Sequence, residues 1–211
     1  MKATSTMESL FRAVANASEW AAKTGTLSRV RLDCWSQRVT VLATDSVAMC
    51  LTSAPAETTE ARHTWLEITR PDLEALTKAV KPGATKESKE AQVSLNFVPE
   101  EGLHVQTGTD DFTFKDIYRE GEADPLGGLM GYFTEWRTEQ VSYPMGVMLS
   151  ATYLARLNRM RKEAPDIGAH IIVPDPAEPV LIKLGRYTRV VIQPIDPVRH
   201  VKAFGGGVLW D

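Results

Sequence analysis

The sequence predicts an α+β fold in which helices cover one face of antiparallel sheets, built as two consecutive units of which the second is abbreviated. Three observations support this prediction. An amphipathic helical pattern opens the chain. Short segments of alternating apolar and polar residues follow it, joined by tight turns, as is typical of antiparallel hairpins. A strand-helix-strand pattern late in the chain then repeats the order of the back half of the first unit, as an internal duplication would.

The first unit is predicted over residues 1–117 and begins with a helix and a hairpin. Apolar residues recur at helical spacing over 7–23, and Gly25 stops the pattern. Over 27–35, apolar residues alternate with Arg and Asp, which predicts a strand with one buried face. A turn then leads into a return strand over 39–43, and a further apolar segment follows it.

The back half of the first unit is predicted to repeat strands around a second helix. A short strand over 64–69 precedes Arg70, where Pro71 suits the first turn of a helix. The buried stripe of this helix is predicted to consist of Leu73, Leu76, Ala79 and Val80. Residues 57–63 and 86–90 are expected to be polar loops, and strands are predicted over 92–98, 103–107 and 111–117.

The abbreviated second unit is predicted over residues 142–211, after a linker. Residues 118–141 have the Gly, Pro and acidic composition of a linker, with a short helix over 129–136. A helix is predicted over 150–163, because Ser150 suits a helix cap and Leu154, Leu157 and Met160 share one side. Strands are predicted over 142–149, 169–173, 180–184 and 189–193, with a flexible tail after them.

Composition indicates an ordinary folded protein. The chain has 211 residues, of which 43% are apolar and 24% charged, enough to bury one or two cores. Its formal net charge is -3, from 24 basic and 27 acidic residues, so bulk attraction to a polyanion cannot carry nucleic-acid binding. Any DNA contact must therefore come from locally clustered Lys and Arg. Cys34 and Cys50 are too few for a disulfide framework or a zinc cluster, and are expected to be small core residues.

Targeting signals are not evident. Residues 1–6 lack the basic and apolar regions of a signal peptide, and no window approaches the ~18 apolar residues that a membrane-spanning helix needs. A cytoplasmic protein without membrane contact is expected.

Two segments carry a family resemblance. Residues 39–49, Val-Thr-Val-Leu-Ala-Thr-Asp-Ser-Val-Ala-Met, resemble the "-LTLVATDG-R-A-" strand and turn of the bacterial replicative DNA sliding clamp. Residues 189–195, Arg-Val-Val-Ile-Gln-Pro-Ile, resemble the C-terminal "YVVMPMR" strand of that family. The order of helices and strands around both segments also follows the family. The resemblance implies a sliding-clamp fold and a processivity factor that encircles duplex DNA without reading its sequence and tethers a DNA polymerase.

The resemblance also implies a groove that binds a short peptide of DNA polymerase and other proteins with a clamp-binding motif. The residues that match its walls are Leu42, Thr44, Ser46, Val47, Ala48, Met49, Val190, Val191 and Ile192. After Thr-Asp the family has Gly-His-Arg or Gly-Tyr-Arg, whereas this chain has Ser46-Val47-Ala48, which makes the groove more apolar. Gln193 adds one residue to the family pattern and could shift the register or form a bulge. Alternating apolar residues on two strands are also ordinary sheet core, so this alternative stays open.

A clamp needs a basic, helix-lined surface that touches phosphates. The residues predicted to face DNA are Arg12, Lys23, Lys78, Lys81, Arg156, Arg159, Arg161 and Lys162. Arg156, Arg159 and Lys162 recur at spacings of three and are predicted to form one ridge on the helix. An ordinary solvated helix face would have the same pattern.

Catalysis is not expected. The four histidines lie at 63, 104, 170 and 200 without ligand-type spacing, and the chain has no Gly-rich phosphate loop or nucleophile elbow. Asp45, Asp110 and Asp111 are the best acid candidates, and the last two lie in a turn-like stretch where such residues usually support backbone geometry. Neither a metal nor a cofactor is predicted.

The sequence is compatible with two oligomeric states. A chain of two clamp-like units is expected to form a homotrimer if a ring closes, since related clamps close six domains. The alternative is a monomeric clamp paralogue, a protein-interaction module that binds clamp clients or another clamp without encircling DNA. The tail over 204–211 ends in Val-Leu-Trp-Asp and is hypothesised to dock into a groove, with a disordered tail as the alternative.

Overall fold

The computed structural model describes residues 1–35, 37–60, 63–98, 101–108, 110–118, 124, 126–129, 149–163, 168–173 and 178–195. Within these ranges, no helix is long and apolar enough to cross a membrane. The predicted strand over 142–149, most of the predicted helix over 129–136 and the tail after 195 lie outside the described residues.

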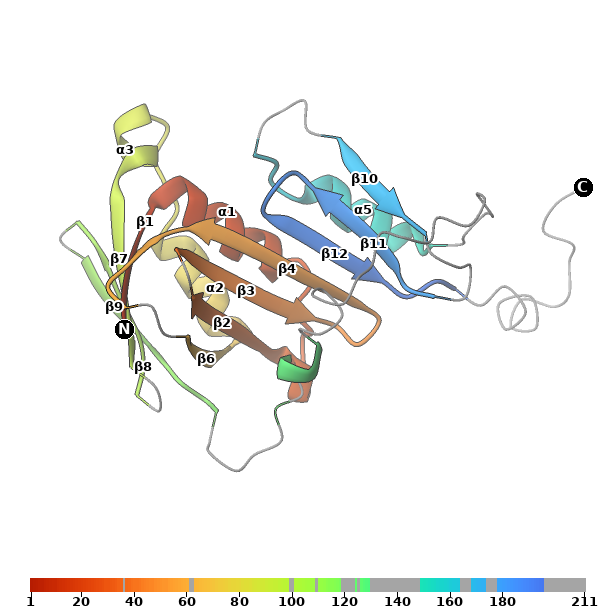
Figure 1. The fold of residues 1–211 in the computed structure, drawn as a ribbon, viewed down its shortest axis with the longest axis horizontal. Helices are drawn as coiled ribbons and strands as arrows, with labels where there is room; N and C mark the ends of the chain where they lie inside the picture. Colours follow the sequence, from red (N-terminus) through yellow and green to blue (C-terminus); the bar gives the residue numbers. More distant parts are fainter. Residues whose placement is uncertain are drawn as a thin grey trace, which may run out of the picture.

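The first unit alternates strands with two main helices (Figure 1). Its elements are β1 (Lys2–Thr6), α1 (Met7–Ser18), a 3₁₀ turn (Thr26–Ser28), β2 (Arg29–Trp35), β3 (Arg38–Thr44), β4 (Ala48–Pro55), β5 (Glu57–Thr58), β6 (Thr64–Thr69), α2 (Arg70–Ala79), α3 (Lys86–Glu90), β7 (Gln92–Val98), β8 (Gly102–Thr107) and β9 (Asp110–Lys115). The elements of the second unit are α5 (Ala151–Arg159), β10 (Ala169–Ile172), β11 (Val180–Leu184) and β12 (Thr188–Ile192). The α+β prediction is confirmed.

The strands form two antiparallel sheets. One has five strands in the order β5-β1-β7-β8-β9, and the other has seven in the order β10-β11-β12-β4-β3-β2-β6. The larger sheet is continuous across the two units because β12 pairs with β4, placing Val190 opposite Cys50. Figure 1 shows α1, α2 and α5 behind this sheet, so one of its faces is covered by helices. The two units therefore share a sheet, and a domain division near residues 117 and 142 remains a proposal.

The first unit consists of two halves with the same element order. Apart from the 3₁₀ turn before β2 and the short helix α3 before β7, one half is β1-α1-β2-β3-β4 and the other is β6-α2-β7-β8-β9, with the short β5 between them. Each half gives its first strand to the other's sheet, since β1 pairs with β7 and β6 pairs with β2. The elements α5, β10, β11 and β12 follow the order of the last four elements of such a half, a helix and three strands.

Buried apolar side chains form two clusters on opposite faces of the large sheet. The main core joins α1, α2 and the helix-side faces of both sheets, and its largest buried side chains include Trp20, Phe97 and Leu76. The smaller cluster lies on the other face and contains Leu42, Leu126, Ile172, Leu181 and Val191. Strand alternation separates them, because successive side chains of β3 and β12 point to opposite faces.

Some predicted elements differ from the structure. Helix α1 ends at Ser18 rather than residue 23, because the chain after it joins the core: Trp20 is fully buried and the Ala22 N–H donates to the Thr44 carbonyl at 2.9 Å. The loop predicted over 86–90 is helix α3, whose start is capped by the Thr85 hydroxyl accepting from the Ser88 N–H at 3.2 Å.

Two further corrections concern the ends of other elements. The predicted loop over 57–63 begins with the two-residue strand β5, which pairs with β1. Helix α5 ends at Arg159 rather than at residue 163. Just after this end, the Arg161 N–H donates to the Asn16 side-chain oxygen at 2.7 Å. Ser150 is the residue before the helix, as predicted, but its side chain makes no capping hydrogen bond.

Candidate peptide-binding groove

The outer face of the large sheet carries an apolar surface where the two units meet. In the sheet register, Leu42 lies opposite Leu51, and Val191 lies opposite both Met49 and Leu181. Cross-strand partners point to the same face, so these side chains form one surface over β3, β4, β12 and β11. The residues at its margin, Leu27, Met49, Leu51 and Leu129, are only partly buried. We call this apolar surface the outer groove, after the groove that the family resemblance implies.

A helical turn over 126–129 covers one side of the outer groove. Leu126 is fully buried against the cluster, and Leu129 packs beside it. One oxygen of the Asp124 carboxylate accepts a hydrogen bond from the Gly127 N–H at 2.6 Å. The other oxygen forms an ion pair with Arg31 Nη1 at 2.7 Å. These bonds fix the turn to β2. Our sequence reasoning missed this wall, although Asp-Pro before an apolar residue is a helix-start signal that could have found it.

The turn over residues 44–48 borders the outer groove. The Thr44 hydroxyl donates to the Ala48 carbonyl at 2.9 Å and accepts from the Ser46 N–H at 3.1 Å. One Asp45 carboxylate oxygen accepts from the N–H groups of Val47 at 3.2 Å and Ala48 at 3.0 Å. Ser46 has a φ of 79°, in the left-handed region that favours glycine. The Thr-Asp pair thus shapes the turn, and Asp45 has a structural role there.

The structure brings together only some of the predicted groove residues. Leu42, Met49 and Val191 lie on the outer groove. Ser46 and Val47 are exposed at its rim, and the Gln193 N–H donates to the Val47 carbonyl at 2.9 Å, which joins the turn to the end of β12. Thr44 is buried within the turn.

Three predicted groove residues lie elsewhere. Ala48, Val190 and Ile192 belong to the main core on the helix side of the sheet. The prediction that Val190, Val191 and Ile192 share one wall is therefore wrong, because adjacent residues of a strand point to opposite faces.

The predicted basic ridge on α5 is largely neutralised. Arg156 forms an ion pair with Asp45, and its guanidinium lies 5.0 Å from the centre of the Tyr153 ring. Arg159 pairs with Glu19 at 3.0 Å. Since α5 ends at Arg159, Lys162 does not continue a helical ridge as predicted.

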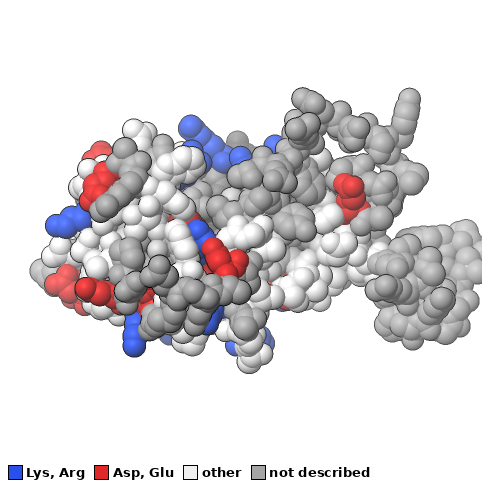
Figure 2. Space-filling view, turned by 60° about the horizontal axis from the view of Figure 1, so that its bottom comes forward, with Lys and Arg blue, Asp and Glu red and all other residues white. Residues whose placement is uncertain are grey.

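The other predicted DNA-facing residues are dispersed. Arg12 lies over the Tyr187 ring at 5.9 Å and Arg161 over the Phe11 ring at 4.4 Å. Lys23, Lys78, Lys81 and Lys162 are exposed, and within the described part of the chain no ion pair joins them to an acid. On the face drawn in Figure 2, Lys and Arg are scattered among acidic side chains, without a continuous basic stripe over the described residues.

A buried charged cluster borders the outer groove on β2 and β6. Arg31 pairs with Asp33 at 3.1 Å and stacks on Trp65, with 3.9 Å between the guanidinium carbon and the ring centre. Glu67 is fully buried, and its Oε1 atom has no hydrogen-bond partner among the described residues. Burial raises the pKa of Glu67, while Arg29, 3.4 Å from its other oxygen, opposes that rise.

The described residues give little support for a reactive thiol or a metal site. Burial raises the pKa of the Cys34 thiol to about 11 and raises that of Cys50 further, so both thiols stay protonated at neutral pH. Among the described residues, no group of His, Cys, Asp and Glu is arranged to hold a metal ion.

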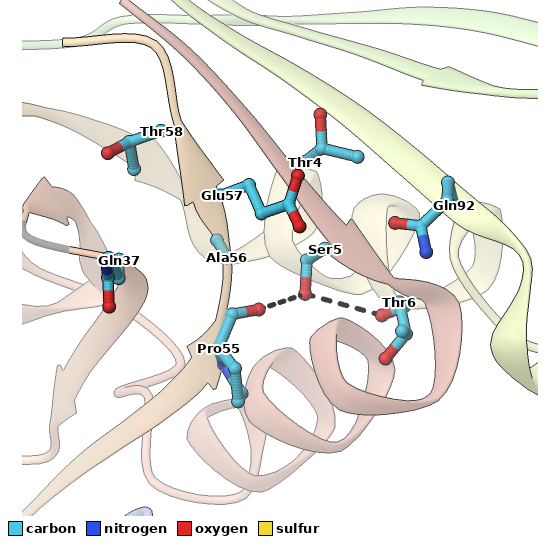
Figure 3. Close-up of a pocket in the computed structure, with 9 residues that line it drawn as sticks. All are labelled: Thr4, Ser5, Thr6, Gln37, Pro55, Ala56, Glu57, Thr58 and Gln92. Carbon is cyan, nitrogen blue, oxygen red and sulfur yellow. Dashed lines mark hydrogen bonds between the residues drawn. The ribbon is translucent and has the colours of Figure 1, made fainter.

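A hollow of about 590 Å³ lies beside β1 and β5 (Figure 3). Its lining mixes polar side chains, among them Ser5, Gln37, Glu57 and Gln92, with apolar surface. Figure 3 shows the Ser5 hydroxyl bonded to the Pro55 carbonyl, a contact of 2.7 Å that joins β1 to the end of β4. Its lining residues lie outside both segments that resemble the clamp family, so the outer groove is the better candidate for peptide binding.

Comparison with known proteins identifies the fold. No protein-family model matches the chain, and no curated protein sequence matches it. It is similar to the DNA polymerase sliding clamp of Caulobacter crescentus, with 16% identity and a TM-score of 0.63 over 93% of this chain and 66% of that one. The clamp of Pseudomonas aeruginosa gives 14% identity and a TM-score of 0.69 over the same shares. A protein from Eubacterium rectale described as a DNA polymerase III beta subunit gives 10% and 0.64, over 96% and 68%.

The chain therefore has a sliding-clamp fold, as its resemblance implied, and spans about two thirds of the length of these clamps. At these identities the similarity establishes the fold alone.

Proposed function

We propose that this chain is a non-catalytic docking factor of the sliding-clamp type, which binds an apolar peptide of a DNA polymerase or another replication protein and holds it to duplex DNA. The observation that carries the proposal is the outer groove, an apolar surface at the junction of two units of a sliding-clamp fold. A module without catalytic activity is consistent with that fold.

The outer groove suits a short peptide with apolar anchors. Its floor, Leu42 and Val191, is already buried, whereas Met49 and Leu51 keep exposed area that a ligand could cover. Methionine adapts its shape to different apolar partners. With Val47 exposed at the rim and no charged residue at 46–48, the contact would depend on apolar burial more than on charge.

Peptide binding can be tested with a fluorescent peptide that carries a bacterial clamp-binding motif. Met49→Glu places a charge on the outer groove and is expected to weaken binding at least about tenfold, since burying an unpaired charge costs several kcal/mol. Trp35→Ser is a matched control, because Trp35 is an exposed aromatic residue at the far end of the β2–β3 hairpin. Equal affinities of wild type and Met49→Glu would refute the groove assignment.

DNA contact is proposed to be weak and independent of sequence. The exposed Lys23, Lys78, Lys81 and Lys162 supply few positive charges, so affinity should be low and should fall further as salt rises. Topological retention would then matter more than affinity. The double variant Lys78→Glu with Lys81→Glu should reduce loading on nicked circular DNA, whereas Lys86→Glu with Lys89→Glu on α3 is the charge-matched control.

A second candidate function is an interaction module that binds clamp clients without encircling DNA. The observation that favours it is that Arg156 and Arg159 are neutralised by Asp45 and Glu19, which leaves α5 with little charge for phosphates. Full peptide binding together with no retention on circular DNA, with or without a clamp loader, would select this function. The predicted homotrimer and the predicted docking of the tail over 204–211 remain predictions.

A further inference from the structure

The hollow beside β1 and β5 lies where the edge of the small sheet is only partly covered. Strand β5 has two residues and pairs with β1 at Ala3 and Thr4. Beyond this pairing, β1 continues through Ser5 and Thr6 into helix α1. The volume that remains there, about 590 Å³, is within the range of sites that bind small molecules. We call this site the β1–β5 hollow.

The polar groups of the β1–β5 hollow favour a ligand that donates hydrogen bonds. Ser5 is 2% exposed, and its hydroxyl donates to the Pro55 carbonyl at 2.7 Å, so its oxygen is left to accept from a ligand. Figure 3 shows the Glu57 side chain extending from β5 toward β1, where Thr4 and Ser5 lie. An ionised carboxylate only accepts hydrogen bonds. The buried Ser5 and the carboxylate of Glu57 thus offer acceptors to one ligand.

The charge of the β1–β5 hollow is negative. Its lining contains Glu57 and no Lys, Arg or His. The Glu57 carboxylate makes no hydrogen bond or ion pair with another described residue. The bases closest to the lining in sequence are Lys2 and Arg38, and neither lines the hollow. A cationic ligand would therefore meet a carboxylate that has no partner in the described part of the chain, and charge strengthens such a hydrogen bond.

The rest of the lining suits a hydrocarbon chain. Pro55 and Ala56 contribute apolar surface beside the polar groups. A chain of methylene groups that ends in an ammonium group matches this mixture, because the methylenes pack on apolar surface while the charged end stays with polar atoms. An ammonium group also has three donors and no acceptor. The lining therefore favours an amine over an anion or a purely apolar ligand.

We propose that the β1–β5 hollow binds an alkylammonium group, with Glu57, Thr4 and Ser5 at the charged end and Pro55 and Ala56 along the methylenes. A lysine side chain of a partner protein and a free polyamine both carry this group. The site shares no residue with the outer groove, so it depends on neither the proposed peptide binding nor the proposed DNA contact. Because Glu57 is exposed, the affinity is expected to be weak and to fall as salt rises.

The test is a titration of the isotope-labelled full chain, followed by the NMR shifts of its backbone amides at constant ionic strength. The probes are n-butylammonium and its uncharged counterpart, n-butanol. n-Butylammonium should cause saturable shifts at residues 4–6 and 55–58, and n-butanol should not. The absence of saturable shifts there, or equal shifts with both probes, would overturn the proposal.

A variant of the carboxylate tests its role directly. Glu57→Gln should raise the dissociation constant of n-butylammonium at least about threefold, because it removes one charge of an exposed ion pair. Glu101→Gln is the matched control, since Glu101 is exposed and lies beyond the opposite end of β7 from Gln92. The amide spectrum also shows whether each variant is folded. Equal dissociation constants for wild type and Glu57→Gln would refute the site.

Two further probes distinguish the sources of the amine. N-acetyl-lysinamide presents the ammonium group as a protein does, and spermidine is a free polyamine. Tighter binding of spermidine would support a free polyamine as the ligand, whereas equal or tighter binding of N-acetyl-lysinamide would support a lysine side chain of a partner. Failure of both to compete with n-butylammonium would contradict the proposal, because all three carry the same group.

Discussion

The two units of this protein differ in how their cores are closed. In the first unit, two halves exchange their first strands, and α2 buries Leu73 and Leu76 completely. In the second unit, α5 has no fully buried residue within its bounds, and Leu154 and Ile171 remain exposed. The same element order therefore leads to different burial in the two units. The amphipathic pattern of a helix shows which side seeks burial, and its neighbours decide how much of that side is buried.

The second unit is held by contacts with the first. Strand β12 extends the sheet from β4, and α5 contacts the end of α1, where Arg159 pairs with the C-cap residue Glu19. The Trp20 indole N–H lies 3.4 Å from the Met160 sulfur, and the Asn16 side-chain amide donates to the Arg161 carbonyl at 3.0 Å. Arg156 reaches the Asp45 turn from the helix side. Disturbing these contacts should affect the second unit more than the first.

The largest expected effect compares Leu73 and Leu154, each the fourth residue of its helix. Leu73→Ala should lower the free energy of unfolding by about 2–5 kcal/mol, because it leaves a cavity in a closed core. Leu154→Ala should cost less than about 1 kcal/mol, since the side chain is 46% exposed. Urea unfolding of both variants measures the difference. Equal costs would mean that the two helices are equally well packed.

The next effect concerns the connection between the units. Asp45→Ala removes two hydrogen bonds of the turn and the ion pair with Arg156, and should cost about 1–3 kcal/mol. Amide hydrogen exchange should become faster in β10, β11 and β12 while α2 stays protected. Asp45→Asn is the control, because it keeps an oxygen acceptor for the turn but not the charge. An exchange pattern unchanged by Asp45→Ala would show that Asp45 does not hold the second unit.

The titration of Glu67 should make the stability of the first unit depend on pH. Burial raises the pKa of Glu67 above its ordinary value of 4.5, so the folded state binds this proton more tightly than the unfolded chain does. Stability is therefore lost as pH rises from about 4.5 through the raised pKa. Glu67→Gln stays neutral, so its stability relative to wild type should increase over that range and then level off. Unfolding experiments as a function of pH would contradict this if the difference stayed constant.

The smallest effect is expected at the rim of the outer groove. Ser46 has a φ of 79°, which costs a residue with a Cβ more than it costs glycine. Ser46→Gly should therefore change stability by no more than about 1 kcal/mol, because the relief of strain is offset by the greater freedom of glycine in the unfolded chain. Thermal unfolding measures this change. A loss well above that size would show that the Ser46 side chain makes a contact of its own.

Much of the fold could be predicted from residue patterns. The strand over 64–69 and the helix starting at Arg70 have the predicted boundaries, because alternation and a proline at the helix start are local signals. The end of α1 could not be predicted, since Trp20 leaves helical geometry to fill the main core. The helix over 86–90 was missed because its cap, Thr85, lies in a stretch that is otherwise polar.

The candidate groove was only partly predictable. The two strands that form it were identified from their resemblance to clamp segments, and the structure pairs β4 with β12. Alternation divides the residues of each strand between the two faces of the sheet. The sequence alone did not show which of these two sets faces the helices. The wall at Leu126 and the pairing of Arg156 with Asp45 depend on contacts between residues far apart in the chain.

The sequence by itself determined the order of helices and strands, the apolar sides of α1 and α2, and the Thr-Asp turn, because these depend on neighbours within a few residues. Only the tertiary structure decided that β12 joins the sheet of the first unit, that α5 loses most of its basic charge to Asp45 and Glu19, and that Leu154 and Ile171 stay exposed. Periodicity shows that a side chain favours burial, but burial itself requires a partner surface, and that surface is assembled only when distant segments pack together.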